Sequence, residues 1–156
     1  MKIIVISDSH GRAGNIFDAI DKNDDCDEVF FLGDGNSDIK QAIALYKDKK
    51  FTCVAGNCDF STRNAELCEY RRINGKTIYL THGHMENVKT GVHDLVQKAS
   101  IVRADVALFG HTHSPFFIKE PITGIYLLNP GSVGEGYYAI LEIKDDGEID
   151  AKHHLI

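Results

Sequence analysis

Polar residues of the kinds that bind metal ions follow five apolar, strand-like runs of this 156-residue chain. Ligands of open α/β sheets bind beyond the carboxyl ends of the strands. If these strands lie side by side, the polar residues that follow them therefore meet at one site. The set contains carboxylate, amide and imidazole groups, which is the composition of a metal centre. Its members are Asp8, His10, Asp34, Asn57, His82, His111 and His113.

The spacing of these residues supports their convergence. Asp8 and His10 are two residues apart, and in an extended segment such residues point to the same side. The pair His111 and His113 has the same spacing. Glycine, which permits a sharp turn and close approach of other groups, directly precedes three of the seven candidates. These pairs are Gly33-Asp34, Gly56-Asn57 and Gly110-His111.

The number and type of candidate ligands predict two metal ions. A tetrahedral site takes about four ligands, so seven candidates fit two ions that share a bridging carboxylate. Mixed Asp, Asn and His ligands suit Mn²⁺, Fe, Zn²⁺ or Ni²⁺, whereas Ca²⁺ and Mg²⁺ prefer oxygen ligands alone. Two such cations attract phosphate and lower the pKa of bound water. The predicted reaction is in-line attack of a metal-bridging hydroxide on phosphorus, with no Ser or Cys nucleophile.

Length, charge and composition narrow the class of protein. We expect residues 1–156 to form one domain. The formal net charge is −6 and the Lys and Arg residues are scattered, whereas proteins that hold long nucleic acid show a basic stripe. No apolar run reaches the roughly 20 residues that span a bilayer. The N-terminus lacks the features of a signal peptide, so we expect a cytoplasmic protein with reduced cysteines and no membrane partner.

The first half of the chain is expected to alternate strands and helices. A βαβαβ order implies a parallel sheet with right-handed crossovers. The helix after the second strand is expected to start with Ser37 or Asp38 as its N-cap and to end near Tyr46. The other expected elements are the strands Lys2–Ser7, Glu28–Leu32 and Phe51–Ala55, and the helix Gly14–Lys22.

The second half of the chain predicts mainly antiparallel strands. Asn74-Gly75 is a strong hairpin signal between two strand-like runs, and a helix is expected over Asn87–Val102. The expected strands are Leu67–Ile73, Lys76–Leu80, Val106–Phe109, Phe116–Lys119, Gly124–Leu128, Tyr137–Ile143 and Ile149–His153. The predicted fold is therefore of the mixed α/β kind, with two sheets packed face to face and helices outside.

The combined motifs resemble the calcineurin-like metallophosphoesterase superfamily. They are Asp8-x-His10, Gly33-Asp34, Gly56-Asn57, Thr81-His82-Gly83 and Gly110-His111-Thr112-His113. The later run Asn129-Pro130-Gly131-Ser132 resembles the small bacterial and archaeal branch that includes the YfcE-type phosphodiesterases. The resemblance implies a four-layer αββα sandwich of two mixed sheets, with this last run near the metal pocket.

The resemblance also implies how the ligands divide between the ions. Asp34 would bridge the two ions, and Mn²⁺ would often give the best activity. One ion would be bound by Asp8, His10, Asp34 and His113, and the other by Asp34, Asn57, His82 and His111.

One position departs from the pattern of many relatives. They carry His after the Gly-Asn pair, whereas this chain carries Cys58. A thiol is a poor substitute for imidazolium as an acid and phosphate anchor at neutral pH. We therefore expect substrates with good leaving groups, and the identity of the general acid stays open.

Several residues near the motifs are candidates for substrate contact. Asn57 and Cys58 are placed beside the predicted pocket, although Cys58 could equally fill a small space. His84 could touch substrate, orient a ligand or lie at the surface. Arg12 and Arg63 lie a few residues past ligand motifs, and for both a solvated side chain is favoured over a phosphate clamp.

The leading hypothesis is a metal-dependent phosphodiesterase acting on small phosphate esters. The nearest alternative is a phosphomonoesterase or nucleotidase with the same metals. A third alternative is a non-catalytic protein-interaction scaffold of the same fold, like the retromer subunit. The complete ligand set counts against the scaffold, and Cys58 favours diesters. The physiological substrate and formation of a homo-oligomer are left open by the sequence.

Overall fold

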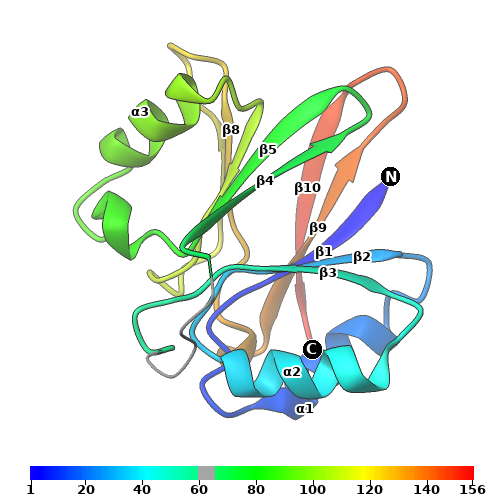
Figure 1. Ribbon diagram of the computed structural model, residues 1–156. Coiled ribbons are helices and arrows are strands. Elements are labelled where there is room, and N and C mark those ends of the chain that lie inside the picture. The colour runs from blue at the N-terminus through cyan, green and yellow to red at the C-terminus, as the bar shows by residue number, and fades with distance from the viewer. Residues whose placement is uncertain (60–65) are drawn as a thin grey trace.

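A computed structural model describes residues 1–59 and 66–156, which form two five-stranded sheets (Figure 1). The first sheet has the order β10-β9-β1-β2-β3 and the second the order β4-β5-β6-β8-β7. The strands of the first sheet are β1 (Lys2–Ile6), β2 (Glu28–Phe31), β3 (Lys50–Cys53), β9 (Tyr137–Ile143) and β10 (Ile149–Leu155). Those of the second are β4 (Cys68–Ile73), β5 (Lys76–Thr81), β6 (Val106–Leu108), β7 (Phe116–Lys119) and β8 (Tyr126–Asn129).

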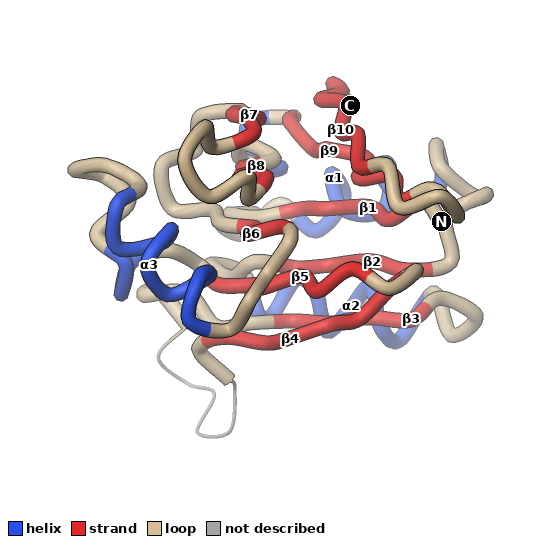
Figure 2. The backbone as a smooth tube through the Cα atoms, turned by 90° about the horizontal axis from the view of Figure 1, so that it is seen from above, coloured by secondary structure: helices blue, strands red, loops and turns tan. Residues whose placement is uncertain are grey.

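Helices cover the outer faces of the two sheets (Figures 1 and 2). α1 (Ala13–Asp21) and α2 (Asn36–Leu45) pack on the first sheet, and α3 (His93–Ile101) packs on the second. Two short 3₁₀ turns, η1 (His84–Glu86) and η2 (Val133–Glu135), lie in connecting segments. The predicted four-layer αββα sandwich of two mixed sheets is confirmed.

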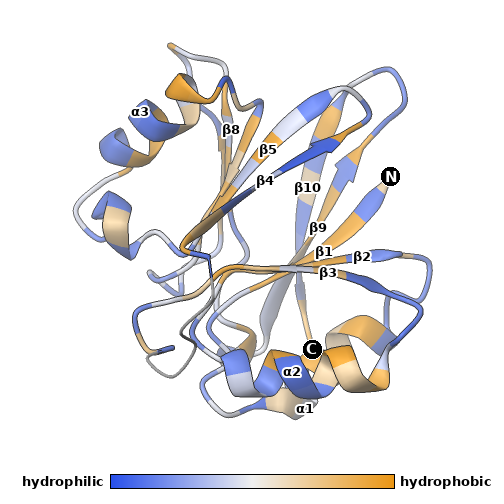
Figure 3. Ribbon diagram, viewed as in Figure 1, coloured by the Kyte–Doolittle hydropathy of each residue, from blue (hydrophilic) through white to orange (hydrophobic). Residues whose placement is uncertain are grey.

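The apolar run of β1 is explained by burial on both of its faces. Ile3 and Val5 face the second sheet and join the core between the sheets, whereas Ile4 and Ile6 face the helices. A strand covered on both faces is apolar throughout because its side chains alternate between two cores. Figure 3 shows the hydrophobic colouring of this strand and of β5, in contrast to the more hydrophilic β4.

The expected parallel pairing of the first half is confirmed, but the antiparallel expectation for the second half is only partly correct. β2 runs parallel to both β1 and β3. β4 with β5, β7 with β8, and β9 with β10 are antiparallel. β6, however, runs parallel to β5 and β8. The segment containing α3 crosses over between β5 and β6, and such a crossover allows parallel pairing.

Two expected helix starts are wrong. α3 begins at His93, because Asn87 has a φ of 50° and Gly91 a φ of 148°, values outside the right-handed helical region. α2 begins at Asn36 after Gly35, and neither Ser37 nor Asp38 is its N-cap. Asp38 instead accepts hydrogen bonds from Ser9 and Gly11, in the loop after β1.

The Asn74-Gly75 hairpin between β4 and β5 is confirmed, with positive φ at both residues. In the described part of the chain, no helix is long and apolar enough to cross a membrane.

Candidate metal centre

The predicted ligands lie on loops from both sheets. Those after β1, β2 and β3 belong to the first sheet, and those after β5 and β6 belong to the second. From the sequence we considered ligand loops that meet at the edge of one sheet. In the structure the ligand loops instead come from two facing sheets and meet between them. Backbone hydrogen bonds join neighbouring loops: Asp8 donates to the Gly33 carbonyl at 2.9 Å, and Gly110 donates to the His82 carbonyl at 3.0 Å.

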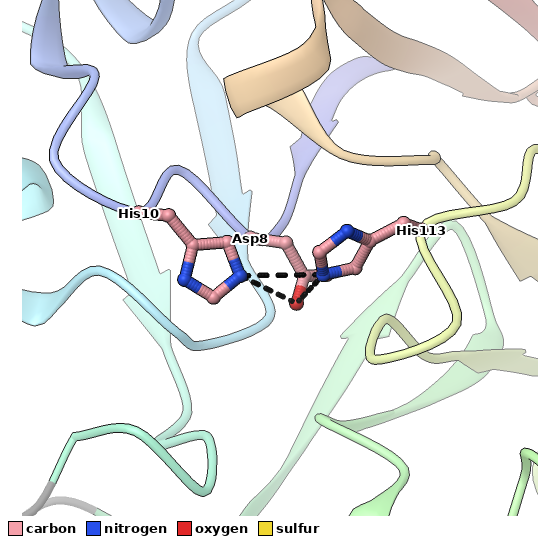
Figure 4. A group of neighbouring side chains, drawn as sticks. All are labelled: Asp8, His10 and His113. Carbon is pink, nitrogen blue, oxygen red and sulfur yellow. Dashed lines mark hydrogen bonds and ion pairs between the residues drawn. The ribbon is translucent and has the colours of Figure 1, made fainter.

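Asp8, His10 and His113 form one group of converging side chains (Figure 4). The Asp8 Oδ1 atom lies 3.2 Å from His113 Nε2 and 3.8 Å from His10 Nε2, and the two ring nitrogens are 3.2 Å apart. Asp8 is fully buried, and its Oδ1 accepts no hydrogen bond from the residues that the structure describes. A buried carboxylate oxygen that faces two imidazole nitrogens fits a divalent cation.

Asp34, His82 and His111 form a second group, which Asn57 joins through its side-chain oxygen. His82 Nε2 lies 3.4 Å from Asp34 Oδ2, 3.2 Å from Asn57 Oδ1 and 3.1 Å from His111 Nδ1. The structure thus places all seven predicted ligands in two neighbouring groups.

Asp34 stands between the groups. Besides its place with His82 and His111, it forms a cluster with His10 and Cys58 in which the potential ligand atoms lie within 4.8 Å of one another. This position is compatible with a bridging carboxylate.

The ring nitrogens of two histidines are oriented by partners outside the two groups. His82 Nδ1 lies 2.7 Å from the Leu32 carbonyl, which can only accept, so this nitrogen carries the proton. His113 Nδ1 likewise faces Glu135 Oε1 at 3.1 Å. In each ring Nε2 is therefore the nitrogen that faces the carboxylates and that could bind a metal ion once it carries no proton, and metal-binding histidines are commonly oriented in this way.

The electrostatics of the second group favour an ionised Asp34 and a neutral His111. Burial opposes ionisation of Asp34, but hydrogen bonds from His82 and the Cys58 backbone hold the pKa of this carboxyl well below its usual range. Burial and the nearby His82 lower the pKa of His111. Burial also opposes protonation of His82, yet the hydrogen bond and charge of Asp34 with the charge of Asp8 raise its pKa. A cation bound by His82 would compete with the proton that this ring takes up.

The backbone at the candidate site is strained. Five of the seven predicted ligands adopt positive φ, namely Asp8, His10, Asp34, His111 and His113. For residues other than glycine this conformation costs about 1–3 kcal/mol each, and such residues cluster at functional sites. The surrounding hydrogen bonds must therefore hold these loops in place.

The remaining sequence candidates occupy different positions. Cys58 is exposed, and its Sγ lies 3.3 Å from Asn57 Nδ2. The His84 ring is 5.4 Å from that of His82, and its Nδ1 is buried without a hydrogen-bond partner in the described chain. Arg12 is exposed, and Arg63 lies outside the described residues.

The run Asn129–Ser132 lies against the ligand loops, as the resemblance implies. Asn129 donates to the Gly110 carbonyl at 2.9 Å, and the Ser132 hydroxyl donates to the Asp8 carbonyl at 2.8 Å.

Sequence reasoning missed three carboxylates around the site. Glu135 contacts His113 from a segment 22 residues away, so no local spacing could have indicated it. Asp38 holds the loop after β1, but in the sequence it is typical of a helix start. Asp59, next to Cys58, accepts backbone hydrogen bonds from two ligand loops, and only its adjacency to the motif could have indicated a role.

Comparisons with known proteins agree with this geometry. A family model described as the calcineurin-like phosphoesterase superfamily domain matches residues 1–146. The probable metallophosphoesterase YsnB of Bacillus subtilis is 29% identical over 153 residues, covering 94% of this chain and 86% of YsnB.

Solved structures share the fold across nearly the whole chain. A structure described as a novel archaeal phosphodiesterase has a TM-score of 0.70 at 24% identity, covering 99% of this chain and 100% of that chain. Vps29 of Entamoeba histolytica, solved with Zn²⁺, has a TM-score of 0.76 at 22% identity, covering 99% of both chains.

Proposed function

The chain belongs to the calcineurin-like phosphoesterase superfamily, and from this premise we propose that it is a metal-dependent phosphodiesterase acting on small phosphate esters. The observation that carries the proposal is the pair of adjoining carboxylate–imidazole groups with Asp34 between them. When bound, two divalent cations would polarise the phosphoryl oxygens and lower the pKa of water, so that they would activate both the ester and the attacking water.

The residues present fit two ions. Asp8, His10 and His113 would hold one ion, and His82, His111 and Asn57 would hold the other, with Asp34 shared. The unsatisfied Asp8 oxygen and the oriented Nε2 atoms of His82 and His113 support this assignment. We propose Mn²⁺ as the preferred ion, because mixed oxygen and imidazole ligands suit it, with Zn²⁺, Fe and Ni²⁺ as further candidates.

The chemistry of Cys58, which lies beside the candidate ligand Asn57, supports a preference for diesters. Burial and the nearby Asp34 raise the pKa of the exposed Cys58 thiol, so this group stays protonated and is a weak acid. A substrate whose leaving group departs without protonation suits such a site. Asn57, a member of the second group, and His84, whose ring lies 5.4 Å from that of His82, are the other side chains proposed to contact the phosphoester.

A comparison of two chromogenic substrates tests this proposal. The protein is stripped of metal, and hydrolysis of bis-p-nitrophenyl phosphate and of p-nitrophenyl phosphate is measured with added Mn²⁺, Zn²⁺ or Ni²⁺. We expect Mn²⁺ to restore faster cleavage of the diester. Faster cleavage of the monoester would instead support the phosphomonoesterase alternative.

Variants of two histidines separate an enzyme from a scaffold. His111→Ala should abolish hydrolysis, whereas His93→Ala, which removes an exposed histidine of α3, should leave it unchanged. If no metal gives hydrolysis and His111→Ala behaves as wild type, the non-catalytic scaffold becomes the better description.

A further inference from the structure

One carboxylate joins the two loops that carry Asp34 and Asn57. Asp59 Oδ2 accepts the backbone N–H of Asp34 at 2.7 Å and that of Gly56 at 2.8 Å. Its Oδ1 accepts the N–H groups of Gly35 at 3.0 Å and Asn36 at 2.9 Å. Four backbone donors from the segments after β2 and β3 therefore point at a single side chain.

The connection runs in both directions. While Asp59 binds the backbone of Asp34, the Asp34 Oδ1 atom accepts the backbone N–H of Cys58 at 2.8 Å. The loops also touch directly, because a side chain at Gly33 would overlap the backbone of Gly56. A shift of either loop would break several hydrogen bonds at once.

Elementary electrostatics explains why this position requires a carboxylate. The first N–H groups of α2 have no partner within the helix, and its N-cap, Gly35, has no side chain to supply one. Asp34 has a φ of 59°, so that successive N–H groups turn toward one point and form an anion-binding concavity. The positive end of the helix dipole adds to the attraction.

We infer that Asp59 is a positioning residue of the metal centre, which fixes Asp34 and Asn57 relative to each other so that both ions can bind together. The inference relies on the proposed function only in taking Asp34 and Asn57 as metal ligands. Groups that orient metal ligands typically change metal affinity 10–100-fold when removed. Asp59 would act through backbone geometry, without touching either ion.

The test compares Asp59→Asn with a matched variant in another part of the molecule. Asp105 also accepts a backbone N–H, from Thr77 at 2.8 Å, and pairs with Lys76 at 3.3 Å, on the second sheet. Asp105→Asn therefore removes a comparable carboxylate contact without touching the ligand loops. Binding of Mn²⁺ is measured by calorimetry, and the spin coupling of two neighbouring Mn²⁺ ions by electron paramagnetic resonance, both without substrate.

We expect Asp59→Asn to weaken Mn²⁺ binding by about 10–100-fold and to lose the spin-coupled signal. It should also speed hydrogen exchange at the amides of Asp34, Gly35, Asn36 and Gly56 in the metal-free protein. Asp105→Asn should keep wild-type binding and coupling. If Asp59→Asn does not fold, Asp59→Glu, which keeps the charge but displaces the acceptor atoms, is measured in the same way.

Two results would overturn the inference: wild-type binding and coupling in the Asp59 variant, or equal losses in the Asp59 and Asp105 variants. Wild-type protein that binds two ions but hydrolyses no ester would overturn the proposed function and leave this inference standing. Wild-type protein that binds no metal would overturn both.

Discussion

At the scale of single residues, hydrogen-bond partners decide what each ligand candidate can do. An imidazole binds a metal through a nitrogen lone pair, so the proton must sit on the other ring nitrogen. Leu32 and Glu135 impose this arrangement on His82 and His113. Asp8 carries the complementary feature, a buried oxygen left without a hydrogen bond in the described residues.

Cys58 gives a first prediction at this scale. Cys58→His would place an imidazole beside Asn57, where it can protonate a departing oxygen. We expect turnover of diesters with poor leaving groups to rise by about 10²-fold, because general acid catalysis typically contributes 10²–10⁴-fold. Bis-p-nitrophenyl phosphate should change much less, since its leaving group departs without protonation.

Rates for an alkyl and a nitrophenyl diester, measured side by side, check this prediction. Cys58→Ser is the control, because it changes the side chain without adding an acid. An equal gain in both variants would show that acid catalysis is not the reason.

The cysteine thiols give a second prediction, because they differ in how deeply they are buried. Burial raises the pKa of Cys26 to about 11 and that of Cys53 to about 12, from an ordinary value of 9.0. All three pKa values are raised, so exposure decides which thiol the reagent reaches: alkylation at about pH 8 should modify the exposed Cys58 faster than Cys26 and Cys53, which should react fully only after denaturant is added. Peptide mapping by mass spectrometry reads this out, and fast labelling of Cys26 in native protein would contradict it.

The same shifts fix the direction of a pH effect. Above pH 9.0 the unfolded chain releases these thiol protons before the native protein does, so the unfolded state binds fewer protons. The free energy of unfolding should therefore fall as pH rises from 9.0 toward about 11. Cys26→Ala should reduce this slope in urea titrations.

At the scale of elements, the exits of strands from the sheets create the site. Gly110 follows β6 and Phe109, and a side chain there would overlap the Ser7 hydroxyl and approach Asp8 Oδ2 at 2.8 Å. The loops after β1 and β6 belong to different sheets, yet the backbone at Gly110 packs directly against the side chains of Ser7 and Asp8. Close approach, more than any special φ, explains the glycine at this position.

Gly110→Ala should therefore disturb the first ligand group. We expect overpacking to lower the free energy of unfolding by about 1–3 kcal/mol. Metal binding should weaken by more than this loss of stability accounts for. Calorimetry and urea denaturation measure the two effects. The control is Gly14→Ala in α1, where a side chain meets open space and should be neutral or stabilising. Unchanged metal affinity in Gly110→Ala would contradict this account of the loop packing.

Elements also show where prediction from sequence succeeds and fails. The strands around the ligands were predicted to within a few residues, because apolar runs and the turns after them are local signals. The start of α3 at His93 was missed, since the left-handed Asn87 interrupts a pattern that continues in the sequence. The parallel pairing of β6 was missed because it depends on the path of a long crossover.

At the scale of the whole molecule, metal binding should couple to stability. The ligands come from loops of both sheets, so an ion that binds the native state holds the sheets together and has no comparable site in the unfolded chain. A ligand at 100 times its dissociation constant stabilises by about 2.7 kcal/mol. Saturating Mn²⁺ should thus raise the Tm by about 5–10 °C, an effect that chelation reverses.

Differential scanning calorimetry with and without chelator measures the shift. His111→Ala should show a clearly smaller rise, while His93→Ala should match wild type. An equal rise in all three proteins would indicate binding elsewhere on the surface.

The sequence by itself determined the chemical identity of the site: seven ligand candidates at strand ends, the glycines before three of them, and the missing imidazole at Cys58. These are properties of short segments, so they can be read locally. Only the tertiary structure decided which strands belong to each of the two facing sheets, and that Glu135 contacts His113 and Asp59 accepts hydrogen bonds from the ligand loops. Such contacts join residues whose separation along the chain carries no signal, because the packing of distant elements alone brings them together.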